Sequence, residues 1–315
     1  MNKSTCHICL QPLKDGDTLY HATCCEKLFE SPRPPVFPYT WEELNELAVR
    51  IVRHHVTVPG VQPKLSMHLE RSGVRKDSRF TLVGLEGGYI LKPPVMEYPE
   101  MPELEHLTMR MAGGFGIATA ECGLIPLDDG KLAYVTRRMD RKGKIKLHME
   151  DMCQLTDRLT EQKYRGSMEQ VGKVILRHCD NALLDALRFF ELAIFSFLTG
   201  NSDMHLKNFS LLYLPGGAIS LSPAYDLLPT KLLLPQDEEE VALMINGRKR
   251  KLTRDDFMHL AESLRLTEKQ TANTFGRFSA RLDAAYPIIE RGCCTPEMKG
   301  RYKALMCERA NRLEL

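Results

Sequence analysis

The chain has 315 residues, 43% of them hydrophobic and 27% charged, with a net charge of +2. These fractions are those of a globular protein, and the small charge gives no reason to expect direct nucleic-acid binding. No run of about 18 apolar residues is present and the first residues lack an apolar secretory core, so we expect a cytoplasmic protein with no membrane contact.

Residues 1–38 are expected to form a cysteine-rich segment with a proline-rich linker. Two short-spaced pairs, Cys6-x₂-Cys9 and His21-x₂-Cys24, stand eleven residues apart and resemble a Cys₃His zinc site. So short a segment buries little apolar surface, and a bound metal would supply the missing stability. The pattern therefore predicts a structural Zn²⁺ site. A small capping segment with reduced, buried thiols is the alternative.

Residues 39–145 are expected to form a small, strand-rich lobe. Thr40 and Glu43 fit a capping box at the start of a helix. The apolar and turn pattern that follows predicts a set of short strands interrupted by a helix over about 102–112. The expected strands are Lys64–Leu69, Phe80–Val83, Tyr89–Leu91 and Leu132–Thr136.

Residues 146–315 are expected to form a larger, mainly helical lobe. A buried helix face is predicted by apolar residues at spacings of 4, 3, 4 and 3, namely Leu183, Leu187, Phe190, Ile194 and Phe197. Thr267 and Gln270 cap another long helix that runs to about Glu290. A small sheet lobe followed by a larger helical lobe is the order of an α+β, bilobed protein-kinase-like fold.

The loop after the first of these helices carries the most specific pattern in the chain. Asp203-x₄-Asn208 has the spacing of a protein-kinase catalytic loop, in which the aspartate takes the substrate proton and the asparagine binds metal. Strands at about 209–213 and 219–221 would form a hairpin that brings Asp226 back toward Asn208. Oxygen ligands from Asn208 and Asp226 suit Mg²⁺.

The alternative for this stretch is an ordinary polar loop, with Asp203 as a cap and Asn208 as a turn residue. Lys207 and the returning Asp226 count against that alternative, because a plain loop needs neither of them. His-Arg-Asp and Asp-Phe-Gly are both absent from the sequence, so an ordinary eukaryotic-type kinase is disfavoured.

A nucleotide-binding side is expected in the strand-rich lobe. Lys92 ends a short strand, from which a lysine can reach nucleotide phosphates, and Glu105 in the following helix could pair with it. Taken alone, a lysine at a strand edge is more often a solvated charge. The turn at residues 58–64 could cover the phosphates, although its one glycine matches neither common phosphate-loop motif.

Five motifs together resemble those of the HipA family of bacterial serine/threonine kinases, the toxins of toxin–antitoxin modules. In chain order they are Gly60-Val61-Gln62-Pro63-Lys64, Tyr89-Ile90-Leu91-Lys92, Arg137-Arg138-Met139-Asp140-Arg141, Asn201–Asn208 and Pro223-Ala224-Tyr225-Asp226. The resemblance covers about residues 50–310 and is closer to HipT, a short form without the full amino-terminal subdomain of HipA. It implies the kinase fold, with ATP and Mg²⁺ as cofactors.

The resemblance also implies a role for each matching residue. Asp203 would accept the substrate proton and Lys207 would contact the γ-phosphate. Asn208 and Asp226 would hold Mg²⁺, and Arg137–Met139 would line the adenine pocket as a hinge. The residues expected to bind nucleotide are Val58, Pro59, Gly60, Val61, Gln62, Lys64, Lys92, Arg137, Arg138, Met139, His205, Asn208 and Asp226.

Members of this family autophosphorylate on a serine just before or within the loop that begins at Gly60, which closes the nucleotide site. Here Thr57 takes the serine-like place and Pro59 stands where HipT has a second serine, so Thr57 and the more distant Ser66 are the candidates. A phosphate would add about −2 charge where the ATP phosphates should bind. The alternative is that Thr57 is simply a β-branched strand residue.

The resemblance further implies a set of partners. They are a protein substrate such as an aminoacyl-tRNA synthetase, a HipB-like DNA-binding antitoxin and a HipS-like small protein. The leading hypothesis is therefore a HipA/HipT-like kinase that arrests growth by phosphorylating a translation component. The alternatives are a small-molecule phosphotransferase of kinase-like fold and a zinc-dependent binding module with a degenerate kinase lobe. The binding module is disfavoured by four intact residues, namely Lys92, Asp203, Asn208 and Asp226.

Overall fold

In a computed structural model of the chain, the structure describes residues 4–14, 16–54, 63–71, 78–83, 87–143 and 145–315. The chain divides into two compact units. The N-terminal unit comprises Met1–Arg110, Ala120–Arg138 and Arg291–Cys294, and the C-terminal unit comprises Met111–Thr119, Met139–Glu290 and Thr295–Leu315. The domain boundaries expected after residues 38 and 145 stay a prediction.

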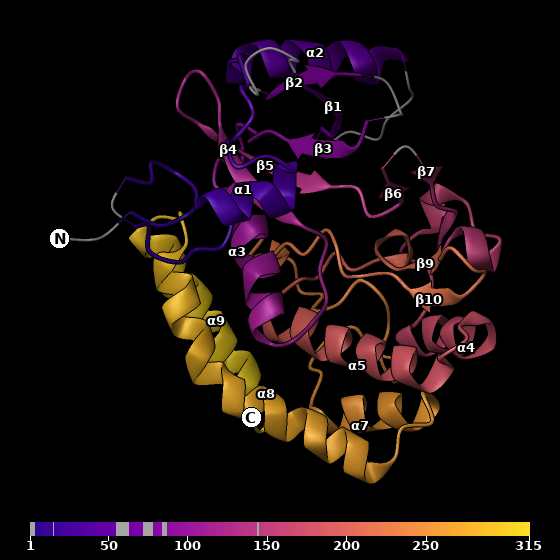
Figure 1. Cartoon of the computed structure of the whole chain (residues 1–315). Helices are drawn as coiled ribbons and strands as arrows, with labels where there is room; N and C mark the ends of the chain where they lie inside the picture. The colour runs from indigo at the N-terminus through magenta and orange to yellow at the C-terminus, as the bar shows by residue number, and fades with distance from the viewer. Residues whose placement is uncertain (1–3, 15, 55–62, 72–77, 84–86, 144) are drawn as a thin grey trace. The chain divides into compact units, whose positions relative to one another are not determined.

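The N-terminal unit is built on an antiparallel sheet of five strands in the order β2-β1-β3-β5-β4 (Figure 1). Its strands are β1 (Leu65–Arg71), β2 (Ser78–Leu82), β3 (Tyr89–Lys92), β4 (Cys122–Pro126) and β5 (Leu132–Arg137). The register pairs Leu91 with both Leu65 and Val135. Because paired residues on neighbouring strands project to the same face, these three side chains line one buried surface.

Four of these strands confirm the sequence expectation, and β4 was not expected. The segment of β4 contains Gly123 and ends at Pro126, two residue types that are depleted in strands. The strand forms at the edge of the sheet, where a proline without an N–H group is tolerated.

Three helices belong wholly or mainly to the N-terminal unit: α1 (Ala22–Phe29), α2 (Trp41–His54) and α3 (Met101–Gly114). The capping box of α2 is confirmed, since the Thr40 N–H group donates to Glu43 Oε2 at 2.7 Å. In return, the Glu43 N–H group donates to Thr40 Oγ1 at 3.3 Å. The box starts α2 where the sequence predicts its first turn.

The core of the N-terminal unit joins the sheet to the Cys-rich head (residues 4–29). Phe29 of α1 packs edge-on against Phe80 of β2, with ring centres 5.9 Å apart, and Phe80 does the same with Tyr89 at 5.1 Å. Cys6 and Ile8 belong to the same buried cluster. The head therefore shares one hydrophobic core with the sheet.

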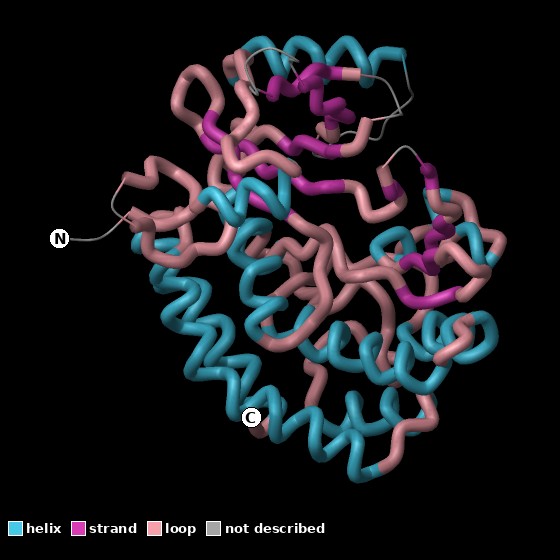
Figure 2. Tube along the Cα trace, in the orientation of Figure 1, coloured by secondary structure: helices cyan, strands magenta, loops and turns pink. Residues whose placement is uncertain are grey.

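The C-terminal unit is mainly helical (Figure 2). Its α-helices are α4 (Met168–His178), α5 (Ala182–Leu198), α6 (Thr230–Leu233), α7 (Arg254–Ser263), α8 (Glu268–Arg291, whose last residue belongs to the N-terminal unit) and α9 (Pro296–Leu313). The expected cap of α8 is confirmed, because the Thr267 N–H group donates to Gln270 Oε1 at 2.9 Å. Short 3₁₀ turns lie at η1 (Gln154–Thr156), η2 (Thr160–Gln162) and η3 (Leu206–Asn208).

The buried face expected on α5 is confirmed at Phe190, Ile194 and Phe197, which are fully buried. At the start of the helix the expectation is wrong, because Leu183 is 54% exposed. α5 begins at Ala182, so Leu183 lies in its first turn, before the helix enters the core. Spacing alone does not show where along a helix burial begins.

A small antiparallel sheet lies beside these helices and has the order β10-β9-β8. Its strands are β8 (Met149–Asp151), β9 (Ser210–Tyr213) and β10 (Ile219–Leu221), so the expected hairpin is confirmed. A further two-stranded pair consists of β6 (Arg141–Lys142) and β7 (Ile145–Lys146). Among the helices that the structure describes, none combines the length and hydrophobicity needed to cross a bilayer.

Candidate active site and metal cluster

The predicted catalytic loop begins where α5 ends, in a Schellman motif at Gly200. The Gly200 N–H group donates to the Phe197 carbonyl at 3.1 Å, and the Asn201 N–H group donates to the Ser196 carbonyl at 2.8 Å. Gly200 has φ +69°, and a Cβ atom there would lie 2.5 Å from Leu305 Cδ2. The backbone angle favours glycine, which turns the chain out of the helix, and a Cβ atom would also force the Leu305 side chain to shift.

The loop brings Asp203 and Asn208 together. The Asp203 N–H group donates to Asn201 Oδ1 at 3.2 Å. The Asp203 carbonyl accepts from the His205 N–H group at 2.8 Å and from Asn208 Nδ2 at 3.1 Å. This last bond turns the amide oxygen of Asn208 away from that carbonyl, and the amide oxygen is the atom that Mg²⁺ would coordinate.

The hairpin returns the chain to this loop just before Asp226. The Tyr225 hydroxyl donates to the Lys207 carbonyl at 2.9 Å and lies 2.6 Å from Ser210 Oγ. Asp226 itself has φ +59°, a left-handed conformation that costs a non-glycine residue about 1–3 kcal/mol. The bond from Tyr225 to the Lys207 carbonyl therefore ties the residue before Asp226 to the residue before Asn208.

Lys207 forms an ion pair that the sequence did not indicate. Its Nζ lies 2.6 Å from Oδ2 of Asp151, and the two side chains are 36% and 15% exposed. Asp151 ends β8 and pairs with Ser210 of β9, so the sheet register brings it beside Lys207. The signal that could have revealed Asp151 is this strand pairing, which no local pattern shows.

Tyr164 is a second partner that the sequence analysis missed. Its hydroxyl donates to Oδ1 of Asp203 at 2.7 Å, and its ring packs edge-on against His205 with centres 5.2 Å apart. Burial and the charge of Asp203 raise the pKa of Tyr164 above its ordinary value, so its hydroxyl remains protonated and donates at neutral pH. Tyr164 therefore restrains the orientation of the Asp203 carboxylate.

His205 is the buried member of the loop, at 6% exposure. Burial lowers the pKa of His205, so its imidazole is neutral at neutral pH. Among the described residues, His205 Nδ1 and Asn201 Nδ2 have no hydrogen-bond partner. Since buried polar atoms are usually paired in folded proteins, these two atoms are available to a water molecule, an ion or a ligand.

The N-terminal unit contains a buried ion pair between Lys92 and Glu105. Lys92 Nζ at the end of β3 lies 2.6 Å from Glu105 Oε1 of α3, and the side chains are 4% and 1% exposed. The pairing expected from the sequence is therefore formed. Burying the two charges costs roughly several kcal/mol of desolvation per ion, so the pair is weak evidence for stability and its charged groups are candidates for a functional site.

Comparison with known proteins identifies the family. Residues 56–286 match the protein family described as the HipA-like C-terminal domain. The chain belongs to this family. A relative from Haemophilus influenzae, named "Putative kinase", is 30% identical in an alignment of 293 residues that covers 84% of this chain and 83% of the relative.

Two further relatives match this HipA-like chain over a smaller part. The "Putative kinase Y4dM" of Sinorhizobium fredii is 34% identical over 61% of this chain. The serine/threonine-protein kinase toxin HipA of Shewanella oneidensis is 26% identical over 61% of this chain. The matched regions are 49% and 47% of these relatives, so the chain spans about half of their length.

Solved structures agree on the fold. Shewanella oneidensis HipA, in its complex with HipB and operator DNA, superimposes with a TM-score of 0.69 and 19% identity, over 96% of this chain and 75% of HipA. The Helicobacter pylori proinflammatory kinase CtkA gives 0.54 and 15%, over 74% of this chain and 90% of CtkA. The predicted α+β, HipA-like kinase fold is confirmed.

The predicted hinge of this HipA-like chain lies where the chain passes from one compact unit to the other, between Arg138 and Met139. The Arg138 N–H group donates to the Gly88 carbonyl at 2.9 Å, which continues the pairing of β3 with β5 by one residue. Arg137 Nη2 lies 3.5 Å from Glu30 Oε1. The role of these residues at adenine stays a prediction.

Most of the predicted phosphate-covering loop lies outside the described residues. This holds for Thr57, Val58, Pro59, Gly60, Val61 and Gln62. Lys64 is described and exposed. Ser66 lies in β1, where its hydroxyl accepts the Gly87 N–H group at 3.1 Å, so phosphorylation of Ser66 would require that bond to break.

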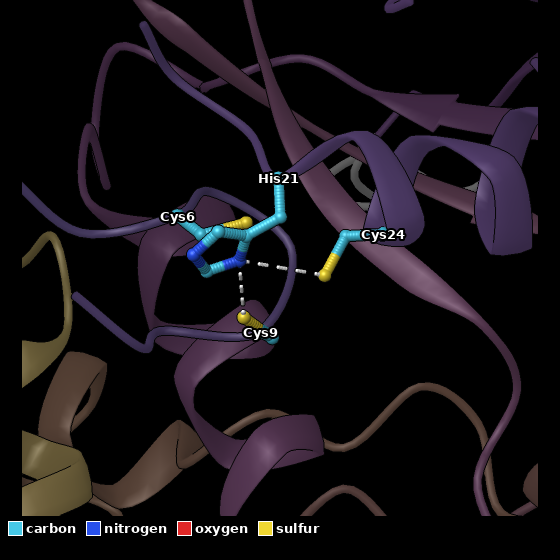
Figure 3. A group of neighbouring side chains, drawn as sticks. All are labelled: Cys6, Cys9, His21 and Cys24. Atoms are coloured by element: carbon cyan, nitrogen blue, oxygen red, sulfur yellow. Dashed lines mark hydrogen bonds between the residues drawn. The ribbon is translucent and has the colours of Figure 1, made fainter. Parts of the chain in front are cut away.

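The predicted metal ligands Cys6, Cys9, His21 and Cys24 form one cluster in the HipA-like chain (Figure 3). One ligand atom from each lies within 4.8 Å of all the others. The hydrogen bond between the two thiols lowers the pKa of Cys6 and raises the pKa of Cys9, and burial raises the pKa of Cys24. The structure thus brings together two pairs that are eleven residues apart in the sequence.

Proposed function

We propose that this HipA-like chain is an ATP- and Mg²⁺-dependent serine/threonine protein kinase. The observation that carries the proposal is the capped loop after α5, in which the Asn208 amide binds the Asp203 carbonyl at 3.1 Å. The hairpin supports it, since Tyr225 binds the Lys207 carbonyl and Asp226 follows directly.

In the proposed reaction, Asp203 orients the substrate hydroxyl and accepts its proton. The hydroxyl oxygen bonds to the γ-phosphorus as the bond from that phosphorus to the β–γ bridging oxygen breaks, and ADP leaves. Because a carboxylate is a weak base for a hydroxyl, proton transfer contributes roughly 10²–10⁴-fold at most. The Tyr164 hydroxyl already donates to Oδ1 of Asp203, so we expect the substrate proton to go to Oδ2.

Asn208 and Asp226 are the proposed Mg²⁺ ligands, because they offer the hard oxygen donors that this ion prefers. Mg²⁺ when bound neutralises phosphate charge. The bond from Asn208 Nδ2 to the Asp203 carbonyl sets the amide orientation in advance. The left-handed backbone of Asp226 is consistent with a position imposed by its surroundings.

The proposed phosphate contacts come from two lysines that are each held by an acid. Lys92 would bind the α- and β-phosphates, with Glu105 holding its ammonium group in place. Lys207 would contact the γ-phosphate, and Asp151 holds it at 2.6 Å. The predicted loop at residues 58–64 and the hinge at 137–139 would complete nucleotide binding, with neutral His205 beside the phosphates.

The proposed setting is a toxin–antitoxin module, which rests on the names of the relatives. Shewanella HipA is named a serine/threonine-protein kinase toxin, and its structure contains HipB and operator DNA. We therefore expect a HipB-like antitoxin, a cytoplasmic location and a protein substrate such as an aminoacyl-tRNA synthetase. A HipS-like protein and autophosphorylation at Thr57 or Ser66 are expected from the family resemblance.

The test is phosphate transfer from γ-labelled ATP by purified chain, compared with the Asp203→Asn variant. We expect transfer to fall by about 10²–10⁴-fold with the circular dichroism spectrum unchanged. The control is Asp255→Asn, which changes an exposed acid in α7 and should leave transfer intact. Equal transfer by wild type and Asp203→Asn would refute the assigned base.

A phosphoproteome comparison after expression of wild type and Asp203→Asn then identifies the substrate. New phosphoserine or phosphothreonine on a translation protein, seen with wild type alone, supports the protein-kinase assignment. Label that enters only small metabolites would instead support the phosphotransferase alternative.

A further inference from the structure

The Cys-rich head contains a site that the proposed kinase reaction does not use. We propose that Cys6, Cys9, His21 and Cys24 bind one structural Zn²⁺, and that this metal holds the head as a clamp on β4 and α3. The clamp lies entirely within the N-terminal unit.

The distances in the cluster fit a tetrahedral metal site. His21 Nδ1 lies 3.3 Å from Cys9 Sγ and 3.7 Å from Cys24 Sγ (Figure 3). Zn–S bonds of about 2.3 Å and Zn–N bonds of about 2.0–2.1 Å, at tetrahedral angles, put sulfur and nitrogen ligands about 3.6 Å apart. The two separations lie on either side of this value, so both distances from His21 to a cysteine sulfur are close to those of a tetrahedral zinc site.

The protonation of His21 also suits a metal ligand. Its Nε2 lies 3.1 Å from the Pro12 carbonyl, which can only accept, so Nε2 carries the proton. In a neutral imidazole this leaves the lone pair on Nδ1, the nitrogen that faces the two cysteines. A backbone carbonyl that fixes the tautomer in this way is the usual support of a metal-bound histidine.

The ligand set indicates a structural ion. Three cysteines and one histidine fill all four positions of a tetrahedral zinc site, which leaves none for substrate or water. Soft thiolate ligands in this geometry favour zinc. The head is too short to bury a core of its own, so a metal would order the turn at Cys6–Cys9 and the start of α1 together.

The ordered head covers the edge strand of the sheet. The Leu124 N–H group of β4 donates to the His7 carbonyl at 2.9 Å, and the Leu124 carbonyl accepts the Tyr20 hydroxyl at 2.9 Å. A Cβ atom on Gly123 would lie 2.9 Å from Ile8, so glycine permits this close approach. Since β4 is the edge strand, the bonds to Leu124 on its outer side come from His7 and Tyr20, which flank the ligands Cys6 and His21.

The head also holds the helix that carries Glu105. His106, the next residue of α3, is buried, and its Nε2 lies 3.0 Å from the carbonyl of Ile8. Ile8 lies between the ligands Cys6 and Cys9. Loss of the metal should therefore loosen α3 where it presents Glu105 to Lys92, and not only the head.

The first experiment measures metal on the full chain purified without chelator. We expect about one Zn²⁺ per chain, and replacement by Co²⁺ should give the charge-transfer and d–d bands of tetrahedral thiolate-bound cobalt. Cys24→Ser and His21→Asn should each lower the zinc content. Cys307→Ser, an exposed cysteine of α9, is the matched control and should keep it.

Two outcomes would overturn the site. One is protein without zinc that gives no thiolate bands with Co²⁺, which would leave a cluster of reduced thiols. The other is zinc content that is equal in Cys24→Ser and Cys307→Ser. Neither measurement uses nucleotide, so both results stay interpretable if the kinase proposal fails. A failure of the zinc site would likewise leave the phosphate-transfer assay interpretable.

The second experiment tests the clamp by hydrogen–deuterium exchange before and after the zinc is removed with a chelator. Peptides that contain Leu124 and residues 101–110 should exchange roughly tenfold faster in the metal-free protein, because the partners of β4 and α3 become mobile. A peptide of β9 in the C-terminal unit is the control and should not change. Unchanged exchange at Leu124 after verified metal loss would overturn the clamp.

Discussion

The two units hold their proposed functional side chains by different means. In the N-terminal unit, Lys92 and Glu105 are buried charges, 4% and 1% exposed, that neutralise each other. In the C-terminal unit, Asp203 is half-buried and is positioned by a loop whose backbone is fixed at Gly200. Stability and function should therefore be coupled at the side chain of Lys92 and separable at the side chain of Asp203.

The largest loss of stability is expected from breaking the buried ion pair of Lys92 and Glu105. Lys92→Met removes the cation that pairs with Glu105 Oε1 in the core, so the free energy of unfolding should fall by about 3–5 kcal/mol. Urea denaturation followed by circular dichroism measures this fall. The double variant Lys92→Met/Glu105→Leu should recover most of the stability and still fail to bind ATP. A single Lys92→Met variant as stable as wild type would contradict the coupling.

A smaller effect is expected at the glycine that starts the catalytic loop. Gly200→Ala must hold φ +69° with its Cβ against Leu305, so unfolding free energy should fall by about 2–3 kcal/mol and phosphate transfer should drop. In Gly216→Ala the backbone has φ +97° but the new Cβ atom meets open space, so the free energy of unfolding should fall by about 1 kcal/mol. Thermal denaturation of both variants separates crowding from backbone strain. Equal losses would mean that the contact with Leu305 does not matter.

Glu103, two residues before Glu105 in α3, shows what a buried acid costs in this unit when no cation among the described residues pairs with it. Burial raises the pKa of Glu103 to about 7 from an ordinary 4.5, and among described residues its Oε2 has no hydrogen-bond partner. Its folded-state pKa lies above its unfolded value, so stability is lost as pH rises through about 7.

Glu103→Gln should therefore stabilise the protein at about pH 8 by about 1–2 kcal/mol. This is less than the full linkage value, because the variant also gives up a favourable charge in the first turn of α3. At about pH 4, where both states are protonated, wild type and variant should unfold alike. Urea denaturation at both pH values measures the difference, and a gain that is independent of pH would contradict this account.

The smallest effect on stability is expected at Tyr164 in the C-terminal unit. Tyr164→Phe removes the hydrogen bond to Asp203 from a side chain that is 44% exposed, so unfolding free energy should change by less than about 0.5 kcal/mol. Phosphate transfer should nevertheless fall by roughly threefold to tenfold, because Asp203 loses its restraint. Steady-state kinetics with Tyr286→Phe in α8 as control measures this. Unchanged transfer would exclude a positioning role for Tyr164.

The parts of the site that were predictable from the sequence depend on neighbours along the chain. The spacing of Asp203 and Asn208 places both in one loop, and Lys92 and Glu105 are close enough in sequence for a strand and the next helix to join them. Asp151 and Tyr164 were missed, because they lie 56 and 39 residues from their partners. No local pattern encodes those two contacts.

The helix caps, the hairpin, the order of sheet and helices and the four candidate metal ligands were predictable from the sequence. The caps and the hairpin follow from residues a few positions apart, where backbone geometry leaves few choices, and the ligands follow from two short-spaced pairs. Three outcomes came from packing alone: β4 forms, the head covers it, and Leu183 is exposed. Those outcomes depend on which surfaces meet after the chain has folded, since burial is a property of the whole packing and not of any one segment.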